Sequence, residues 1–312
     1  MKFDLKKRLR NYFINKLSQD DYVKAALIYN KIVARIKEIN NYKSINNLVN
    51  CNQPLIFISQ IPRSGGTLLR SLFDDHPECH VFPHELSWAK IQRSWPTIPK
   101  RLLSHPKDVY RYILDRWIDH AIVNGYRKKY VFLFNRRLQN KIFKKIMHRK
   151  LNNGEKIKQR DLLDIYFTSF FNAWIDYQNL YTNKKYCVAF CPNILKEQHG
   201  VELFFQDYHD GYRIHIIRDP LSWWTSEKKY GDKEKNVEDY LDRWKISVEN
   251  AISLYHKYNG KYLVMDYAHL IKHPEDTMSK LCNIIGISFS DILLLPTFNS
   301  IPTNPNSSFE VK

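Results

Sequence analysis

The chain has 312 residues, of which 44% are hydrophobic and 26% are charged, a composition typical of an ordinary soluble globular protein. Its longest apolar runs are far shorter than the ~20 residues of a membrane-spanning helix, and no apolar stretch of a secretory signal follows the basic N-terminus. The five cysteines are dispersed and odd in number, which excludes a disulfide framework and leaves Cys187 and Cys191 without the second pair that a zinc site needs. The sequence therefore predicts a cytoplasmic protein with free thiols and no metal.

The formal net charge of +17 is concentrated in one segment of the chain. Residues 121–160 contain 13 lysines and arginines against a single acid, Glu155, so this segment supplies +12 of the total. A segment of this kind attracts an anionic partner: a polyanionic acceptor, a membrane surface or a nucleic acid. The alternative interpretation is a solvated helix face that binds nothing.

In chain order, residues 1–53 read as a helical N-terminal extension, because apolar side chains such as Val23 and Leu27 are spaced among lysines and asparagines. Residues 55–59 are continuously apolar, which is typical of a strand buried on both faces. A glycine turn follows, and then a helical segment at 67–73. Strand, glycine loop and helix come in the order that a phosphate-binding unit requires.

Three further segments have the pattern of buried strands: residues 187–190, 212–217 and 262–265. A helix is expected at 270–285, and the middle of the chain, about 86–183, reads as mostly helical. Strands that alternate with helices predict an α/β fold with a parallel β-sheet flanked by helices. We therefore expect one domain at 54–312 that contains a helical insertion at about 86–183.

The loop at residues 61–67 carries the first chemical signal. Successive backbone N–H groups in a glycine turn at a helix N-terminus form a concave anion site, and Gly65 and Gly66 permit the close approach of a phosphate. Side chains of the same loop can add hydroxyl and guanidinium donors: Arg63, Ser64 and Thr67. A Walker A loop would continue with a lysine after Gly66, and this chain has none there, which disfavours a metal-dependent NTPase.

Arg218 and Ser226 carry the second signal. Arg218 follows the predicted strand at 212–217, and Ser226 comes eight residues later in the next predicted helix. The carboxyl ends of parallel strands are where open α/β sheets bind ligands. We therefore expect the Arg218 guanidinium and the Ser226 hydroxyl to converge on one phosphate.

Taken together, these motifs resemble those of the sulfotransferases that use 3′-phosphoadenosine 5′-phosphosulfate (PAPS) as the sulfuryl donor. Residues 62–69, Pro-Arg-Ser-Gly-Gly-Thr-Leu-Leu, resemble the 5′-phosphosulfate loop of that family, and residues 217–220 with Ser226 resemble its 3′-phosphate motif. Further stretches are similar to the family at residues 74–77, 267–270 and 296–309. The resemblance covers about 54–90 and 185–309, and it is closer to the bacterial, carbohydrate and tyrosylprotein branches than to the cytosolic enzymes that carry Lys in place of Arg63.

This resemblance implies a P-loop NTPase-like sulfotransferase fold and in-line transfer of a sulfuryl group from PAPS to an acceptor hydroxyl without a metal. Arg63 would stabilise the developing charge, and Arg218 with Ser226 would bind the 3′-phosphate. The remaining residues that would bind the donor are in the loop: Ser64, Gly65, Gly66, Thr67 and Leu68. The family places a Glu or His general base soon after its second strand, where this chain has His84 and Glu85; Glu85 is slightly preferred, and the alternative is a solvated pair at a helix start.

Two positions depart from the family pattern. Gly66 replaces a common Thr, which removes one hydroxyl but keeps the backbone cradle. Phe190-Cys191-Pro192 stands where many members have Lys-Thr-Pro, so a second contact to the sulfuryl group is missing. Lys196, or a residue from elsewhere, is a candidate to replace it.

The acceptor expected from the family branch and the basic segment is an anionic glycan or glycolipid, with peripheral contact at the inner membrane surface through residues 121–160 and nucleic acid disfavoured. Two alternative functions remain open at this point. One is a P-loop nucleotide phosphotransferase or kinase, and the other is a polyanion-binding protein that uses the 121–160 segment.

Overall fold

The computed structural model describes Asp21 and residues 47–86, 95, 97–113, 117–124, 126, 130, 132–192, 198–230 and 236–303. Apart from Asp21 and residues 47–53, the predicted N-terminal extension lies outside the described residues. None of the described helices is both long enough and apolar enough to span a bilayer.

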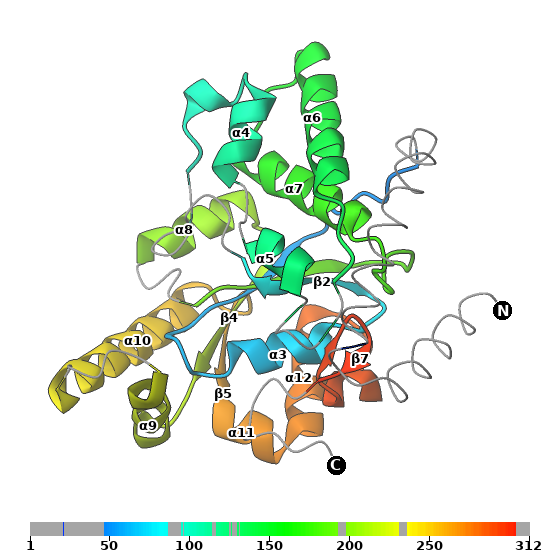
Figure 1. Ribbon diagram of the computed structural model, residues 1–312. Helices are drawn as coiled ribbons and strands as arrows, with labels where there is room; N and C mark the ends of the chain where they lie inside the picture. The colour runs from blue at the N-terminus through cyan, green and yellow to red at the C-terminus, as the bar shows by residue number, and fades with distance from the viewer. Residues whose placement is uncertain are drawn as a thin grey trace.

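Five parallel strands form the central sheet, in the order β2-β3-β1-β4-β5 (Figure 1). Their bounds are Leu55–Ile58 for β1, Cys79–Glu85 for β2, Tyr186–Phe190 for β3, Tyr212–Ile217 for β4 and Tyr262–Asp266 for β5. The α/β fold with a parallel sheet, predicted from the alternation of apolar segments, is confirmed. Strand β1 lies at the centre, so the loop that leaves its carboxyl end is flanked by β3 on one side and β4 on the other.

The residues of β1 explain why the strand reads as a continuous apolar run. Leu55 and Phe57 pack into the core on one face of the sheet, whereas Ile56 and Ile58 pack into the core on the other face. All four side chains are fully buried. Because a strand presents alternate side chains to opposite faces, both faces of this sheet must be covered by helices.

One face is covered by α3 (Gly66–Phe73), α11 (Tyr267–Lys272) and α12 (Pro274–Ile285), which lie below the sheet in Figure 1. The structure corrects the single helix expected at 270–285. The helix breaks at His273, and Pro274 begins α12 at a position where proline needs no hydrogen-bond partner for its nitrogen. Gly286 ends α12 in the left-handed conformation, with a φ of 75°.

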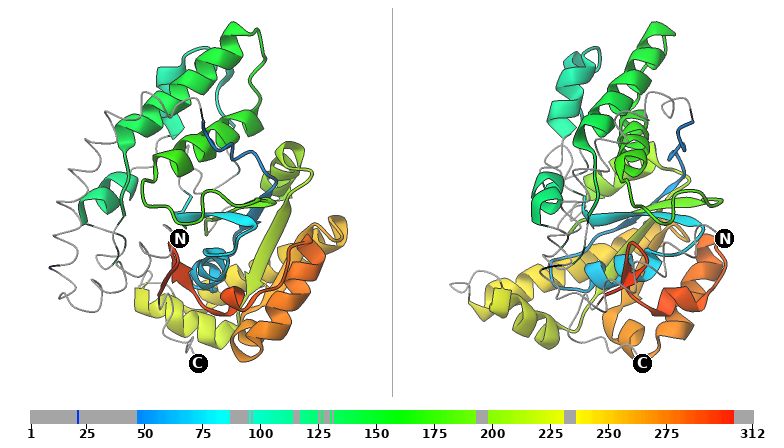
Figure 2. Two further views of the ribbon diagram at one scale, coloured as in Figure 1. Left: turned by 90° about the vertical axis from the view of Figure 1, so that its right-hand side faces the viewer. Right: turned by 45° about the vertical axis from the view of Figure 1, so that its right-hand side comes forward.

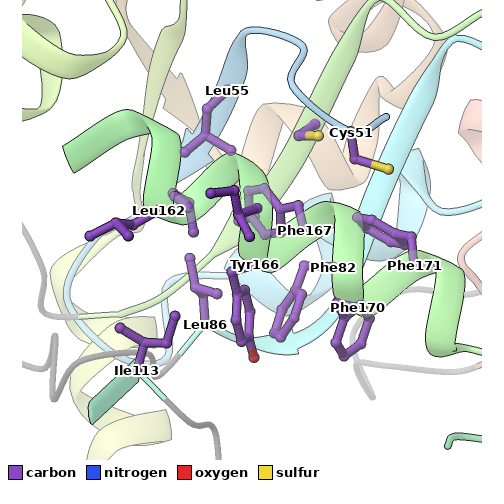
Figure 3. Close-up of a cluster of buried hydrophobic side chains, with 14 of the residues drawn as sticks. Cys51, Leu55, Phe82, Leu86, Ile113, Leu162, Tyr166, Phe167, Phe170 and Phe171 are labelled. Atoms are coloured by element: carbon purple, nitrogen blue, oxygen red, sulfur yellow. The ribbon is translucent and has the colours of Figure 1, made fainter. Parts of the chain in front are cut away.

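The other face is covered mainly by α7 (Gln159–Ala173), α8 (Gln198–Asp207) and α10 (Val237–Lys257). Figure 3 shows that α7 lays a run of aromatic side chains, including Tyr166, Phe167 and Phe170, beside Phe82 of β2. Outside α7 lies a further layer made of α4 (Pro106–Ile113) and α6 (Arg136–Asn152), which projects away from the sheet in both views of Figure 2.

The remaining described elements are short or lie at the edges of the molecule. They are η3 (Lys100–Leu102), α5 (Trp117–Asn124), α9 (Pro220–Tyr230), η4 (Asp291–Leu294) and the hairpin of β6 (Thr297–Phe298) and β7 (Ile301–Pro302). The buried Asp74 anchors the hairpin, because its carboxylate accepts hydrogen bonds from Thr297 Oγ1 and Ser300 N at 3.0 and 3.2 Å. This contact ties the C-terminal hairpin to the end of α3.

Candidate functional site

The backbone conformation of the loop between β1 and α3 depends on its two glycines. Gly65 has a φ of 107°, in the left-handed region, and precedes the first residue of α3. A Cβ at Gly65 would overlap the ring of Tyr267, and a Cβ at Gly66 would overlap the ring of Phe190 and the side chain of Gln60. Both glycines are therefore required by the close approach of side chains from the end of β3 and from the residues just after β1 and β5.

The loop has the properties of an anion cradle. The first N–H groups of α3 have no acceptor within the helix and lie at its positive end. Ser64 is 1% exposed, and its hydroxyl has no hydrogen-bond partner among the described residues. A buried hydroxyl in this position costs free energy unless it is bonded, so its environment fits a phosphate oxygen. The residues present at this loop thus fit the 5′ end of a nucleotide.

Arg218 lies directly after β4 and contacts the same loop. Its Nη1 donates to the backbone oxygen of Arg63 at 3.0 Å, and its Nε donates to Ser222 Oγ at 3.2 Å. In turn, Arg63 Nε donates to Ser226 Oγ of α9 at 3.4 Å. Two motifs that lie more than 150 residues apart in the sequence therefore meet at the carboxyl end of the sheet.

Arg63 holds a backbone conformation that is rare for a residue with a side chain. Its φ is 68°, in the left-handed region, and its side chain is exposed. The Arg218 hydrogen bond to the Arg63 carbonyl, and the bond from Trp223 Nε1 to Pro62 O at 2.7 Å, hold this part of the loop. Strained backbone of this kind persists where the surroundings determine it, and it is common at functional sites.

Aromatic residues complete the site, and the sequence patterns do not reveal them. The guanidinium carbon of Arg218 lies 4.7 Å from the centre of the Tyr267 ring, whose other neighbour is Gly65. Trp244 Nε1 of α10 donates to the backbone oxygen of Arg218 at 2.8 Å. The sequence places Tyr267 in a stretch that resembles the family, residues 267–270, but only the fold shows that its ring lies between the glycine loop and Arg218.

His84 and Glu85 are the last two residues of β2, so they lie at a strand end rather than at a helix start. Glu85 is exposed and pairs in register with Phe190, whose ring lies against Gly66. This register places Glu85 close to the start of α3. It joins the base candidates to the same edge of the sheet as the phosphate loop.

His84 is half-buried, and its ring meets Tyr126 edge-on with centroids 6.4 Å apart. Tyr126 is held from two sides. Its hydroxyl accepts a hydrogen bond from Arg70 Nη2 of α3 at 3.2 Å, and its ring stacks on Phe298 of the C-terminal hairpin at 3.9 Å. The edge of the site near β2 is therefore built from three segments that are distant in the sequence.

Lys196 is the expected candidate to replace the lysine that many family members carry at the position of Phe190. Lys196 lies outside the described residues. The nearby cation Arg213 is fully buried, and its Nη1 donates to the carbonyl of Ser59 at 2.9 Å, which secures the chain where it enters the loop. Burial lowers the pKa of Arg213 to about 10, and it leaves the guanidinium without access to a ligand.

All five cysteines are buried and free. Burial raises the pKa of the Cys282 thiol to about 11, which keeps it in its neutral form. Among the residues that the structure describes, no group of three or more His, Cys, Asp or Glu side chains is placed to hold a metal ion.

A model of the sulfotransferase family matches residues 54–291, and no curated protein matches. One similar solved structure is the sulfotransferase domain of the Synechococcus PCC 7002 olefin synthase, with 20% identity and a TM-score of 0.48 over 79% of this chain and 78% of that one.

Two other solved structures are similar at lower scores. The sulfotransferase domain from the curacin biosynthetic pathway has 19% identity and a TM-score of 0.44, over 78% of this chain and 77% of that one. Retinol dehydratase in complex with androsterone and inactive cofactor PAP has 13% identity and a TM-score of 0.34, over 81% of this chain and 65% of that one. The match to the family model, which spans well over half of the residues and includes the glycine loop and Arg218, shows that the chain belongs to the sulfotransferase family.

Proposed function

We propose that this sulfotransferase takes its sulfuryl group from PAPS. One observation carries the proposal: Arg218, at the end of β4, donates to the backbone of Arg63 in the glycine loop, while the Arg63 side chain reaches Ser226. A nucleotide with phosphate groups on both its 5′ and 3′ positions requires two adjacent anion sites. A nucleotide that has only a 5′ chain requires one.

The residues of this edge have distinct roles in the proposal, in which bound PAPS supplies the sulfuryl group. The backbone N–H groups from Ser64 to Leu68 hold the 5′-phosphate, together with the buried Ser64 hydroxyl. Arg218 and Ser226 bind the 3′-phosphate through charge-assisted hydrogen bonds. Arg63, whose Nε donates to Ser226 Oγ in this structure, would offer its guanidinium to the charge that develops during transfer, and preorganised donors of this kind are usually the largest single contribution to catalysis.

Glu85 is the proposed general base, and His84 is the alternative. The exposed carboxylate of Glu85 lies at the end of β2, next to the strand whose Phe190 ring lies against Gly66 at the start of α3. An acceptor hydroxyl held there would give its proton to this carboxylate as the sulfuryl group transfers. Because His84 is adjacent and packs against Tyr126, only separate substitutions distinguish the two.

The proposed acceptor is an anionic glycan or glycolipid. Support comes from the chain between β2 and β3, in which Tyr126 meets the ring of His84 and residues 121–160 supply +12 of the net charge of +17. Positive potential near a site raises the local concentration of an anionic substrate and speeds its encounter.

Thermal unfolding with ligands tests the choice of donor. PAP at a hundredfold excess over its Kd should stabilise the protein by about 2.7 kcal/mol, and the melting temperature should rise accordingly. ATP with magnesium should have a much smaller effect at the same concentration. A shift with ATP and magnesium but none with millimolar PAP would contradict the proposal and favour a phosphotransferase.

Transfer of labelled sulfate from PAPS to a panel of glycans, glycolipids, small phenols and tyrosine peptides tests the acceptor. We expect incorporation into the anionic glycan or glycolipid fraction. Labelling confined to phenols or peptides would refute the acceptor while leaving the donor proposal intact.

A further inference from the structure

Helix α6 presents a regular line of cations to solvent. Arg137, Lys141, Lys145 and Arg149 are all exposed and follow one another at intervals of four residues. Residues at this spacing lie along one side of a helix, over about 18 Å of its axis. We call these four residues the basic stripe.

The opposite side of α6 is apolar and turned inward. Ile142, Phe143 and Met147 are buried in the core that α6 shares with α7 and α4. The apolar side of the helix is thus already packed against the rest of the protein and cannot insert into a lipid bilayer. Any partner of the exposed side must be attracted by charge.

Three described acids of this outer layer each pair with a cation that is not part of the stripe. Asp119 pairs with Arg136 at 2.8 Å, and Glu155 pairs with Lys150 at 2.9 Å. Asp108 of α4 lies 3.9 Å from Arg111. The stripe lies in the segment at residues 121–160, where 13 lysines and arginines stand against one acid, and such an excess of one sign attracts an anionic partner.

The position of α6 separates the stripe from the nucleotide site. The helix packs on α7 and α4, and Figure 1 shows it rising away from the sheet on the side opposite α3, α11 and α12. Each element that supplies the glycine loop, Arg218 or Ser226 lies at or below the sheet. The stripe follows one exposed side of the helix, which suits an extended anionic surface better than a ligand that must be enclosed.

From this geometry we propose that the basic stripe binds the surface of an anionic phospholipid bilayer and holds the protein there by charge alone. Clusters of four or more Lys and Arg on one helix face are typical of such binding, which decays within a Debye length of the lipid headgroups. The proposal does not depend on the nature of the sulfuryl donor. It would place the protein next to lipid-linked acceptors.

Co-sedimentation with vesicles tests the proposal on the full chain. The protein should bind vesicles of phosphatidylcholine with phosphatidylglycerol, should not bind phosphatidylcholine alone, and should be released when NaCl is raised from about 50 to about 500 mM. The variant Lys141→Gln/Lys145→Gln/Arg149→Gln should bind anionic vesicles at least about tenfold more weakly.

The matched control removes three exposed lysines elsewhere: Lys245→Gln/Lys272→Gln/Lys280→Gln, from α10, α11 and α12. This control should bind vesicles nearly as well as the unaltered protein. Equal losses in both triple variants would show that net charge alone matters and would overturn the proposal. So would unchanged binding of the stripe variant, or binding of a sulfated polysaccharide or duplex DNA without binding to vesicles.

Thermal stabilisation by PAP should be the same in both triple variants and in the unaltered protein. This measurement separates the two proposals, because it reports on the nucleotide site while sedimentation reports on the stripe. Its magnitude also shows whether each variant is folded.

Discussion

Gly66 is a helical glycine at which alanine should be destabilising. Within an ordinary helix, alanine is more stable than glycine by about 0.5–1 kcal/mol. At Gly66 the added Cβ would overlap the Phe190 ring and the Gln60 side chain. We expect Gly66→Ala to lower the free energy of unfolding by about 1–3 kcal/mol in urea titrations and to weaken PAP binding in calorimetry.

A double-mutant cycle with Phe190→Ala identifies the cause. Removal of the ring creates space for the new methyl group, so the cost of Gly66→Ala should be smaller in that background. Strictly additive costs would show that the contact between these two residues is not responsible.

Arg218 should determine recognition of the 3′-phosphate. We expect Arg218→Ala to weaken PAP binding by about 10- to 100-fold, which corresponds to the loss of a hydrogen bond to a charged group, and to leave AMP binding much less affected. Isothermal titration with both nucleotides measures this difference. Lys245→Ala, on the exposed side of α10, should change neither affinity. Equal losses for PAP and AMP would refute the role assigned to Arg218.

Substitutions of Glu85 and His84 should have different effects on kcat, which identifies the general base. If Glu85 is the base, Glu85→Gln should lower kcat by about 100-fold or more while the affinity for PAP is kept, because proton transfer at this position contributes about 10²–10⁴ in rate. His84→Ala should then have a smaller effect on kcat. The reverse order would assign the base to His84, and near-normal turnover in both variants would place the base elsewhere.

At the scale of elements, the half-buried carboxyl group of Asp164 links α7 to Tyr208, the residue that follows α8. Tyr208 donates its hydroxyl proton to Asp164 Oδ1 at 2.8 Å, and Arg160 lies 3.5 Å from the same carboxylate. Burial raises the pKa of Asp164 to about 7, against the opposing effects of Tyr208 and Arg160. The folded protein therefore binds this proton more tightly than the unfolded chain does.

The sign of the pH dependence follows from that difference. The contribution of Asp164 to stability is complete below its unfolded pKa of about 3.9 and is lost as pH rises toward 7. Relative to Asp164→Asn, the unaltered protein should lose up to about 1.4 kcal/mol of unfolding free energy per pH unit across this window. Urea titrations of both proteins at pH 5 and pH 7 measure it; a constant difference would contradict the shifted pKa.

At the scale of the whole molecule, the net charge of +17 should oppose folding at low ionic strength. Added salt screens this repulsion, since the Debye length falls to about 10 Å at 0.1 M. The melting temperature should therefore rise between about 20 and 200 mM NaCl. The stripe variant, with three fewer positive charges, should gain less, and an equal or larger gain in that variant would contradict the argument.

The elements that could be predicted are those whose signal is local. Residues 55–59 and 212–217 read as strands because both faces of the sheet are covered, and the glycine loop reads as a turn. Strand β2 was implied only by the resemblance, since Pro83 and two histidines interrupt its apolar pattern. Pro274 marked the break between α11 and α12 in the sequence, but the expected helix ran through it.

Contacts between distant segments could not be predicted. Tyr267 reaches Gly65 across about two hundred residues, and Tyr126 is held by Arg70 and Phe298 from opposite ends of the chain. The periodicity of apolar residues does not predict these contacts, because they depend on which strands are neighbours in the sheet. Only the resemblance to the family predicts that Arg63, Arg218 and Ser226 belong to one site. Only the fold shows which of them are in contact.

The order of strands in the sheet has an evolutionary consequence. The proposed donor residues follow β1 and β4, whereas α4 to α7 all belong to a single crossover between the neighbouring strands β2 and β3. Substitutions in that crossover can alter what is presented beside Glu85 and leave the contacts of Arg218 with the glycine loop unchanged. We therefore expect substitutions between β2 and β3 to change acceptor choice while the binding of the donor is kept.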